Sequence, residues 1–256
     1  MSDTITLSII IPAYKEGDEF AEKLETLEAF LASRPNYGRV EVIVMMQSDD
    51  DSGDREAAAS EARKYKKIRV VNLGKRAGKG GAVRAGMFEA KGQYKLFMDA
   101  DLATPIIHFD QVFALIQKKA EVGIAVRDLV SIHKDLQRKL ITKAGNILAQ
   151  VILLPGIKDT QSGFKFFSAE AADKIFSRLT ITGWGFDLEA LALARKFGYH
   201  VETFDASDWK DPKATGLVGD SPGGAAVQVL LDLFKVRWKL ITRQYEKETF
   251  SYSPKR

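Results

Sequence analysis

The first hundred residues alternate between short apolar runs and segments with helical spacing of apolar residues, and this alternation constrains the fold most strongly. The apolar runs are rich in β-branched residues, as buried strands are. Strands are therefore expected at residues 5–12, 40–46, 68–73 and 94–98, and helices at 20–31, 55–66 and 80–90. This β-α-β-α-β order predicts an α/β fold with a doubly wound, mostly parallel sheet flanked by helices.

The rest of the chain continues the α/β pattern less regularly. Strands are expected at residues 122–126, within 159–167 and at 200–206, and helices at 109–119, 134–154, 169–179 and 187–197. Residues 208–224 contain prolines and glycines, which favour a mobile loop. A last amphipathic helix is expected over residues 225–245.

Composition narrows the classes of function. The chain has 256 residues, a net charge of +4 and no cysteine, which excludes disulfides, thiolate metal sites and a cysteine nucleophile. The positive charge favours anionic partners, but no Lys/Arg run with interleaved aromatics predicts nucleic-acid binding. Neither a signal peptide nor an apolar stretch of about 18 residues is evident. We therefore expect a cytoplasmic protein, or a peripheral one on the cytoplasmic face of a membrane.

Polar segments directly follow each of the first four predicted strands. They are residues 13–16, 47–54, 74–81 and 99–104. In an open α/β sheet, ligands bind beyond the carboxyl ends of the strands. We therefore expect these four segments to converge on one site.

Asp99 and Asp101 form a D-x-D pair at the end of the predicted strand 94–98. A hard cation such as Mg²⁺ or Mn²⁺ binds a few carboxylate oxygens and completes its shell with water and phosphate. The metal would bridge a diphosphate and neutralise it as a leaving group. A bare D-x-D is common by chance, so the prediction depends on its place after a buried strand.

A glycine-rich basic run, residues 74–81, precedes a predicted helix. Glycines let backbone N–H groups approach an anion, and a helix N-terminus favours negative charge. Gly80 follows Lys79 where a Walker A loop needs Ser or Thr, and the run does not follow the first strand as a dinucleotide fingerprint should. A phosphate cradle is the functional interpretation, and a basic surface turn is the alternative.

Several motifs occur in an order that resembles a known family. They are IIIPAYKE at residues 9–16, an acidic loop after the second strand, GKGGAVR at 78–84 and MDAD at 98–101. Together they resemble the family 2 inverting glycosyltransferases of GT-A fold. DTQSGFK at 159–165 and WGFDLE at 184–189 are similar to dolichyl- or polyprenyl-phosphate hexosyltransferases, which include β-glucosyltransferases and mannose synthases. The resemblance covers roughly residues 5 to 215.

The resemblance implies roles for individual residues. The nucleotide-sugar site would comprise Pro12, Ala13, Tyr14, Glu16, Asp49, Asp50, Lys79, Asp99, Ala100 and Asp101, with Asp99 and Asp101 holding the metal. Arg127, Arg138 and Thr142 would bind the lipid phosphate, for which a bidentate guanidinium is suited. Asp187 and Glu189 are candidate bases for a hydroxyl acceptor, although acidic residues near a helix N-terminus also simply stabilise the helix.

The implied activity is transfer of a hexose, with glucose favoured, from a nucleotide sugar, with UDP favoured, to polyprenyl or dolichyl phosphate. A lipid phosphate is largely dianionic at neutral pH and needs little help from a base. The implied catalytic domain spans residues 1–220, and residues 221–256 form an amphipathic helix and tail. Residues 45–54 depart from the family's V-D-D-G-S-x-D, so the choice between UDP and GDP as the donor nucleotide stays open. The Q-x-x-R-W signature of processive synthases is missing.

Alternatives remain at this point. The nearest is a soluble family 2 transferase with a hydroxyl acceptor, and two others are a nucleotidyltransferase and a non-enzymatic sugar-nucleotide sensor. Residues 144–157 and 227–238 are apolar or amphipathic, with basic residues near the second segment. They would lie in a lipid interface, or else pack against the catalytic domain or another subunit of a homo-oligomer.

Overall fold

The computed structural model describes residues 4–14, 16, 19–48, 68–127, 136–209, 222–247 and 249–250. For residues 48, 75, 136–143 and 222–226 it describes the backbone only. The helix expected over residues 55–66 lies outside the described residues, as do Asp49 and Asp50, which were predicted to bind the nucleotide sugar. Of the predicted mobile loop, residues 210–221 also lie outside them.

A seven-stranded sheet forms the centre of the described structure, with the order β3-β2-β1-β4-β6-β5-β7. The neighbouring pairs β3/β2, β2/β1, β1/β4 and β5/β7 are parallel, while β6 runs antiparallel to both β4 and β5. This confirms the mostly parallel sheet. The strands are β1 (Leu7–Tyr14), β2 (Val40–Ser48), β3 (Ile68–Lys75), β4 (Tyr94–Met98), β5 (Val122–Val126), β6 (Phe164–Ser168) and β7 (Val201–Asp205).

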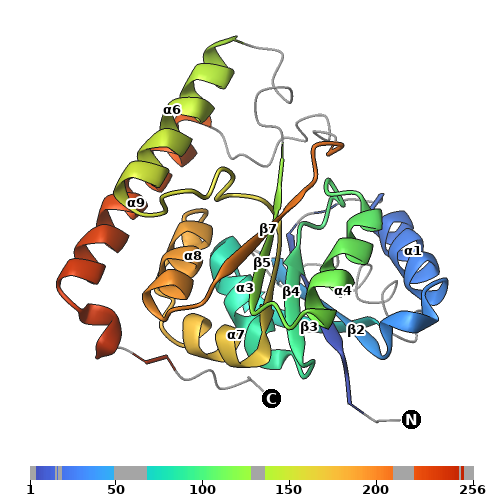
Figure 1. Ribbon diagram of the computed structural model, residues 1–256. Helices are drawn as coiled ribbons and strands as arrows, with labels where there is room; N and C mark the ends of the chain where they lie inside the picture. The colour runs from blue at the N-terminus through green and yellow to red at the C-terminus, as the bar shows by residue number, and fades with distance from the viewer. Residues whose placement is uncertain are drawn as a thin grey trace.

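Helices cover both faces of the sheet (Figure 1). One face packs on α1 (Glu19–Ala32) and α4 (Phe109–Gln117), and the other on α3 (Gly78–Glu89), α7 (Ala169–Phe176) and α8 (Phe186–Lys196). Strand alternation explains the two cores, because successive side chains point to opposite faces. Ile9 and Ile11 lie in the α1/α4 core, whereas Ile10 lies in the core beneath α3.

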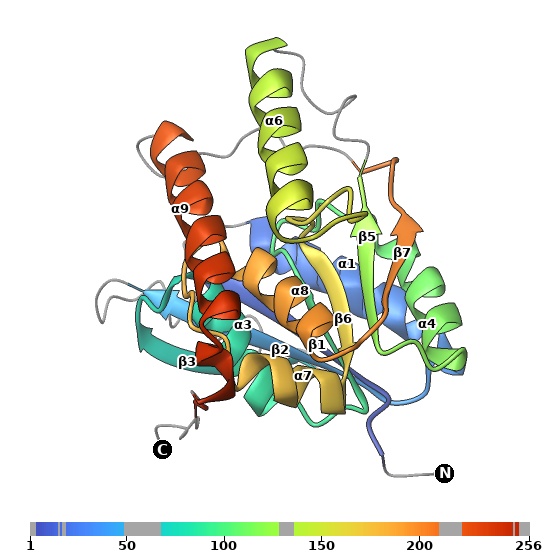
Figure 2. The ribbon, with the colours of Figure 1, turned by 60° about the vertical axis from the view of Figure 1, so that its left-hand side comes forward.

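Two further helices, α6 (Leu136–Ile152) and α9 (Pro222–Ile241), stand side by side outside α8 (Figures 1 and 2). The chain also forms the short 3₁₀ helices η1 (Pro35–Tyr37), η2 (Ile106–His108) and η3 (Gln244–Glu246). Within the described ranges, no helix is long and apolar enough to cross a membrane.

Two helices begin a few residues earlier than the apolar periodicity predicts. The helix expected from residue 80 begins at Gly78, so Lys79 lies in its first turn. The last helix begins at Pro222, so the predicted loop does not extend to residue 224. Proline is tolerated in the first turn of a helix because the N–H it lacks has no intrahelical partner there.

Candidate functional site

The aspartate pair lies where β4 ends, in a turn that fixes both residues. The Asp99 N–H donates to the Gly163 carbonyl at 3.0 Å, and the Leu102 N–H donates to the Asp99 carbonyl at 3.2 Å. The Ala103 N–H donates to Asp101 Oδ1 at 3.0 Å. Leu102 has a φ of +52°, a conformation that L-residues adopt at some cost. The backbone therefore orients the pair at the carboxyl end of β4.

Lys79, in the first turn of α3, is the partner of Asp99. Its Nζ lies 2.7 Å from Asp99 Oδ1. Burial lowers the pKa of Lys79, but the negative charges of Asp99 and Asp187 more than offset this, and the pKa is raised overall. Lys79 therefore stays charged, and its ammonium lies 5.1 Å from the centre of the half-exposed Trp184 ring.

Glu16, just beyond β1, adds a third carboxylate to this region. Its Oε1 accepts from the Tyr14 N–H at 3.1 Å. Burial raises the pKa of Glu16, and the charges of Asp101 and Asp99 raise it further. Burial, together with the charge of Asp99, also raises the pKa of Asp101. The three carboxylates at the ends of β1 and β4 thus outnumber Lys79 and Lys23, the two lysines whose charges act on them.

This excess charge fits a divalent cation. Carboxylate oxygens are the donors that Mg²⁺ and Mn²⁺ prefer. Among the residues described, no group of three or more His, Cys, Asp or Glu forms a complete metal site. Asp99 and Asp101 supply oxygens of this kind, and a metal that takes its remaining ligands from a bound diphosphate and water stays a prediction.

The strand-end segments meet as predicted, as far as they are described. The Arg76 guanidinium lies 4.5 Å from the centre of the Tyr14 ring. The Ala77 N–H donates to Oε1 of the buried Gln47 at 2.7 Å. Pro12 and Ala13 are buried in β1, and Ala100 is buried between the two aspartates.

The glycines in the first turn of α3 serve close packing. A Cβ on Gly78, whose φ is +74°, would lie 2.4 Å from the Thr182 carbonyl oxygen. A Cβ on Gly80 would lie 2.5 Å from the Cβ of Phe186. The Gly81 N–H donates to the Thr182 carbonyl at 3.1 Å. The absence of side chains therefore lets α3 contact the segment before α8, and phosphate binding by this run stays a prediction.

A buried ion pair lies behind Lys79. Lys165 Nζ lies 2.7 Å from Asp187 Oδ1, and these side chains are 0% and 4% exposed. Lys165 also donates to the Ser162 carbonyl. Burial lowers the pKa of Lys165 and raises that of Asp187. Lys165 therefore occupies one oxygen of the Asp187 carboxylate, and a role of Asp187 as a base stays a prediction.

Glu189, two residues further along α8, is a structural residue. Its two carboxylate oxygens accept from the backbone N–H groups of Thr180 and Ile181, from the Thr180 hydroxyl and from the Tyr245 hydroxyl. The side chain is fully buried. A carboxylate with four donors is not available to take a proton from an acceptor, so the candidate base Glu189 is corrected to an anchor.

The predicted acceptor residues lie after β5 and on α6. Arg127, after β5, binds Asp159 through Nε at 2.5 Å and Nη2 at 2.8 Å, and stacks 3.9 Å from the centre of the Trp209 ring. Arg138 and Thr142 lie on α6, and their side chains lie outside the described residues. Binding of a lipid phosphate by these three residues stays a prediction.

Sequence reasoning assigned no role to four residues of this region: Gln47, Gly163, Lys165 and Tyr245. The sequence did indicate a partner for Lys165, because a lysine inside the apolar run FKFFS requires a buried acid. Nothing in the sequence indicated the contact of Gly163 with the aspartate pair, although a Cβ there would lie 1.9 Å from Asp99 Oδ2. Tyr245 lies in a short 3₁₀ helix after α9, and its contact with Glu189 could not be read from the sequence.

Comparison with known proteins gives concordant matches. The family model for glycosyl transferase family 2 matches residues 8–176. The chain is 31% identical over 258 residues to a dolichyl-phosphate beta-glucosyltransferase of Dictyostelium discoideum, covering 93% of this chain and 76% of that protein. It is 29% identical over 261 residues to the enzyme of that name from Homo sapiens, covering 96% and 79%.

Two solved structures share the fold. Mannosyl-3-phosphoglycerate synthase from Rubrobacter xylanophilus matches with a TM-score of 0.66 at 15% identity, covering 92% of this chain and 75% of that one. The mannosyltransferase PcManGT from Pyrobaculum calidifontis, in complex with GDP-Man and Mn²⁺, matches with a TM-score of 0.55 at 18% identity, covering 91% and 64%. At these identities the likeness concerns the fold alone, and it confirms the expected GT-A architecture.

Proposed function

Because this chain is a glycosyltransferase that belongs to glycosyl transferase family 2, we propose that it transfers glucose from UDP-glucose to dolichyl phosphate or another polyprenyl phosphate. One observation carries the proposal. The Lys79–Asp99 pair lies beside Asp101 at the carboxyl end of β4, in a chain similar over most of its length to dolichyl-phosphate beta-glucosyltransferases.

On the donor side, Asp99 and Asp101 would hold Mg²⁺ or Mn²⁺. When bound, the metal neutralises the diphosphate so that it departs more readily. Lys79 supplies a second positive charge, and its place in the first turn of α3 orients it toward the same anion. Tyr14 and Glu16 would contact the nucleoside, together with Pro12, Ala13, Ala100, Asp49 and Asp50.

On the acceptor side, Arg127, Arg138 and Thr142 would hold the lipid phosphate. A phosphate oxygen attacks the anomeric carbon as the bond from that carbon to the diphosphate oxygen breaks, with inversion to a β-linked product. A largely dianionic phosphate has no proton to lose in this step. This mechanism requires no protein base. It is therefore compatible with the ion pair between Asp187 and Lys165.

The outer face of α9 supports contact with a lipid surface. Its exposed apolar residues recur three or four positions apart and so share one face: Val227, Leu230, Leu231, Phe234, Trp238 and Ile241. Exposed Lys235 and Arg237 flank that face. On the opposite side, Leu233 and Val236 are buried against the domain. An apolar face with flanking basic residues suits an anionic membrane interface.

The proposed activity is tested with radiolabelled UDP-glucose, Mn²⁺ and dolichyl or undecaprenyl phosphate in detergent. We expect an organic-extractable product that contains glucose. Parallel reactions with GDP-mannose and UDP-N-acetylglucosamine define the donor. Transfer to a glycan or small hydroxyl acceptor, with none to either lipid phosphate, would contradict the proposal and support the alternative acceptor class.

The membrane contact is tested by flotation with phosphatidylcholine vesicles that contain phosphatidylserine. We expect the wild type to float and a Phe234→Ser/Trp238→Ser double variant to stay in the dense fraction. Ile107→Ser is the matched control, because Ile107 is an exposed apolar residue on η2. Equal flotation of the wild type and the double variant would exclude this face.

A further inference from the structure

Residues 179–185, here named the bracing segment, connect α7 to α8 and contact the first turn of α3. The contact is close, because Gly78 and Gly80 leave no room for a Cβ against Thr182, Ile181 and Phe186. The Gly81 N–H donates directly to the Thr182 carbonyl. Because this turn carries Lys79, the position of the bracing segment sets where the Lys79 ammonium meets Asp99.

The bracing segment is itself held from the C-terminal part of the chain. Glu189 accepts the backbone N–H groups of Thr180 and Ile181 at 2.8 and 2.7 Å. The Tyr245 hydroxyl donates to the same carboxylate at 2.7 Å, and the Lys239 ammonium lies 3.3 Å from the Thr180 hydroxyl. Glu189 and Tyr245 are both fully buried. A residue after α9 therefore shares one acceptor with the segment that positions Lys79.

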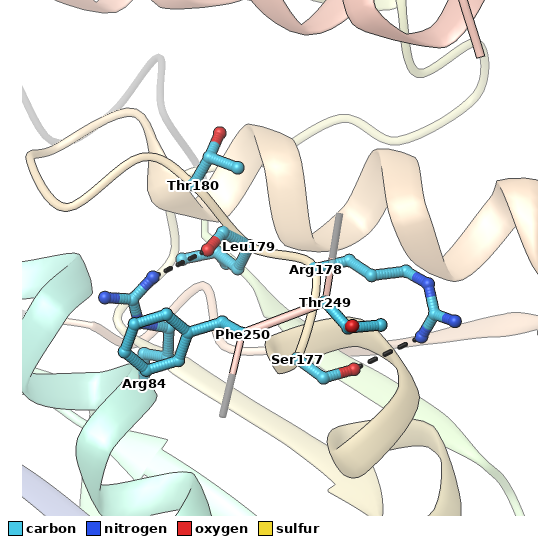
Figure 3. Close-up of a pocket in the computed structure, with 7 residues that line it drawn as sticks. All are labelled: Arg84, Ser177, Arg178, Leu179, Thr180, Thr249 and Phe250. Atoms are coloured by element: carbon cyan, nitrogen blue, oxygen red, sulfur yellow. Dashed lines mark hydrogen bonds between the residues drawn. The ribbon is translucent and has the colours of Figure 1, made fainter. Parts of the chain in front are cut away.

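The chain beyond Tyr245 extends this contact (Figure 3). The Phe250 N–H donates to the Ser177 carbonyl, and the Phe250 ring lies 3.9 Å from the Arg84 guanidinium carbon. Arg84 in turn donates to the Leu179 carbonyl at 2.8 Å. These residues line a pocket of about 280 Å³ between α3, the bracing segment and the C-terminal chain. Phe250 thus contacts Ser177, just before the bracing segment, directly, and Leu179 of the segment through Arg84.

We propose that Tyr245 and Glu189 are positioning residues for the donor site, which act through the bracing segment on the first turn of α3. Neither residue touches Asp99 or Asp101 through any contact described above. Their effect on donor binding arises because a displaced bracing segment moves the turn that carries Lys79. The identity of the donor used in the test rests on the proposed function, but the structural coupling does not.

The first measurement is amide hydrogen exchange in the protein without ligand. Tyr245→Phe removes the hydroxyl and keeps the ring, and Glu189→Gln removes the charge with little change of shape. We expect the Gly81 amide to exchange about tenfold faster in Tyr245→Phe, and faster still in Glu189→Gln. The Ile10 amide in β1 serves as an internal reference and should change little, whereas general destabilisation would accelerate both amides.

The second measurement is the affinity for UDP with Mn²⁺, by calorimetry, together with KM and kcat for UDP-glucose. We expect the Kd of UDP and the KM to rise about fivefold in Tyr245→Phe, with a smaller change in kcat. Tyr199→Phe is the matched control, because the buried Tyr199 hydroxyl has no hydrogen-bond partner among the described residues. It should behave as the wild type in both measurements.

Unchanged Gly81 exchange in both variants overturns the proposal. So does faster exchange with an unchanged Kd, because the bracing segment would then move without consequence for the donor. A wild type that binds no UDP contradicts the proposed donor instead. In that case the exchange of Gly81 relative to Ile10 still decides whether Tyr245 and Glu189 position the α3 turn.

Discussion

Two groups of charge, a half-buried one around Asp99 and a fully buried one around Glu189, differ in how many hydrogen bonds their carboxylates receive. Glu189 receives four hydrogen bonds from three residues. At the other group, Asp101 and Glu16 have raised pKa values, because burial and neighbouring negative charges both disfavour ionisation. Lys79 provides a single cation beside Asp99.

The difference separates a structural acid from one suited to ligand binding. A fully hydrogen-bonded carboxylate stabilises the fold and has little to gain from a ligand. A group of like charges is unfavourable alone and is stabilised by a cation or by a bound anion that brings one. The bracing segment binds Glu189 at Thr180 and Ile181 and contacts the turn that carries Lys79 at Thr182, so it links the two groups.

The strongest test of this contrast is Asp101→Asn. We expect glucosyl transfer to fall about 1000-fold, because a metal ligand and its charge are lost from the reacting diphosphate. The melting temperature should stay the same or rise, since the raised pKa of Asp101 marks a group whose charge burial disfavours. Transfer is measured at saturating Mn²⁺, and near-normal activity there would contradict the metal role.

Glu189→Ala should show the opposite behaviour, a large loss of stability. Buried donors on Thr180, Ile181 and Tyr245 would lose their acceptor, at a cost of roughly 3 kcal/mol in the free energy of unfolding. Urea denaturation measures this loss. Stability equal to that of the wild type would show that Glu189 does not anchor the segment.

Gly163→Ala sharpens the contrast with a single methyl group. A Cβ there would lie 1.9 Å from Asp99 Oδ2, so Asp99 or the strand must move. We expect transfer to fall by about tenfold, because small displacements of reacting groups are costly. Gly145→Ala on α6 is the control, since a Cβ there meets nothing within 4 Å. Equal steady-state rates in both variants would refute the constraint on Asp99.

The smallest expected effect concerns Asp232 of α9, which packs against Gly185 at the start of α8. Burial raises the pKa of Asp232, and the hydrogen bond from Gln228 only partly opposes this. The folded state therefore holds the proton to higher pH than the unfolded state, whose Asp pKa is about 3.9. The stability that Asp232 contributes is present below that value and lost as pH rises through the folded pKa.

Asp232→Asn should therefore gain stability relative to the wild type as pH rises from 4 to 7. Thermal melts across this range measure the difference. If the melting temperatures of the two proteins change in parallel with pH, the pKa of Asp232 is the same in the folded and unfolded states. A gain in stability would show that Asp232 differs from both Glu189 and Asp101. It would be a buried acid that is neither well hydrogen-bonded nor placed at a ligand site.

The sequence was sufficient to predict the first four strands and the place of Asp99 and Asp101, because apolar periodicity and strand-end polarity are local signals. The run FKFFS reads as a buried strand in either direction, so the antiparallel orientation of β6 could not be predicted. Partners distant in sequence were equally hidden. Gly81 with Thr182 and Glu189 with Tyr245 are tertiary contacts that no periodicity encodes.

The same distance bears on two roles that the sequence suggested. The glycines at residues 78–81 suggested a cradle for an anion, because glycine permits close approach of any group. In the structure the backbone of Thr182 approaches them, and phosphate binding by this run stays a prediction. Glu189 suggested a base for the same reason that it serves as an anchor: a carboxylate near the start of a helix can interact with many donors.

The place of β6 between β4 and β5 has a consequence for synthesis on the ribosome. Until residues 164–168 emerge, β4 is an edge strand of the sheet β3-β2-β1-β4, with its hydrogen-bonding groups open to other chains. Asp99 also lacks the Gly163 carbonyl that holds its backbone. A nascent chain of about 150 residues thus contains both aspartates, but its site is incomplete and its unpaired edge strand is prone to aggregation. Chaperones would be most needed at this stage.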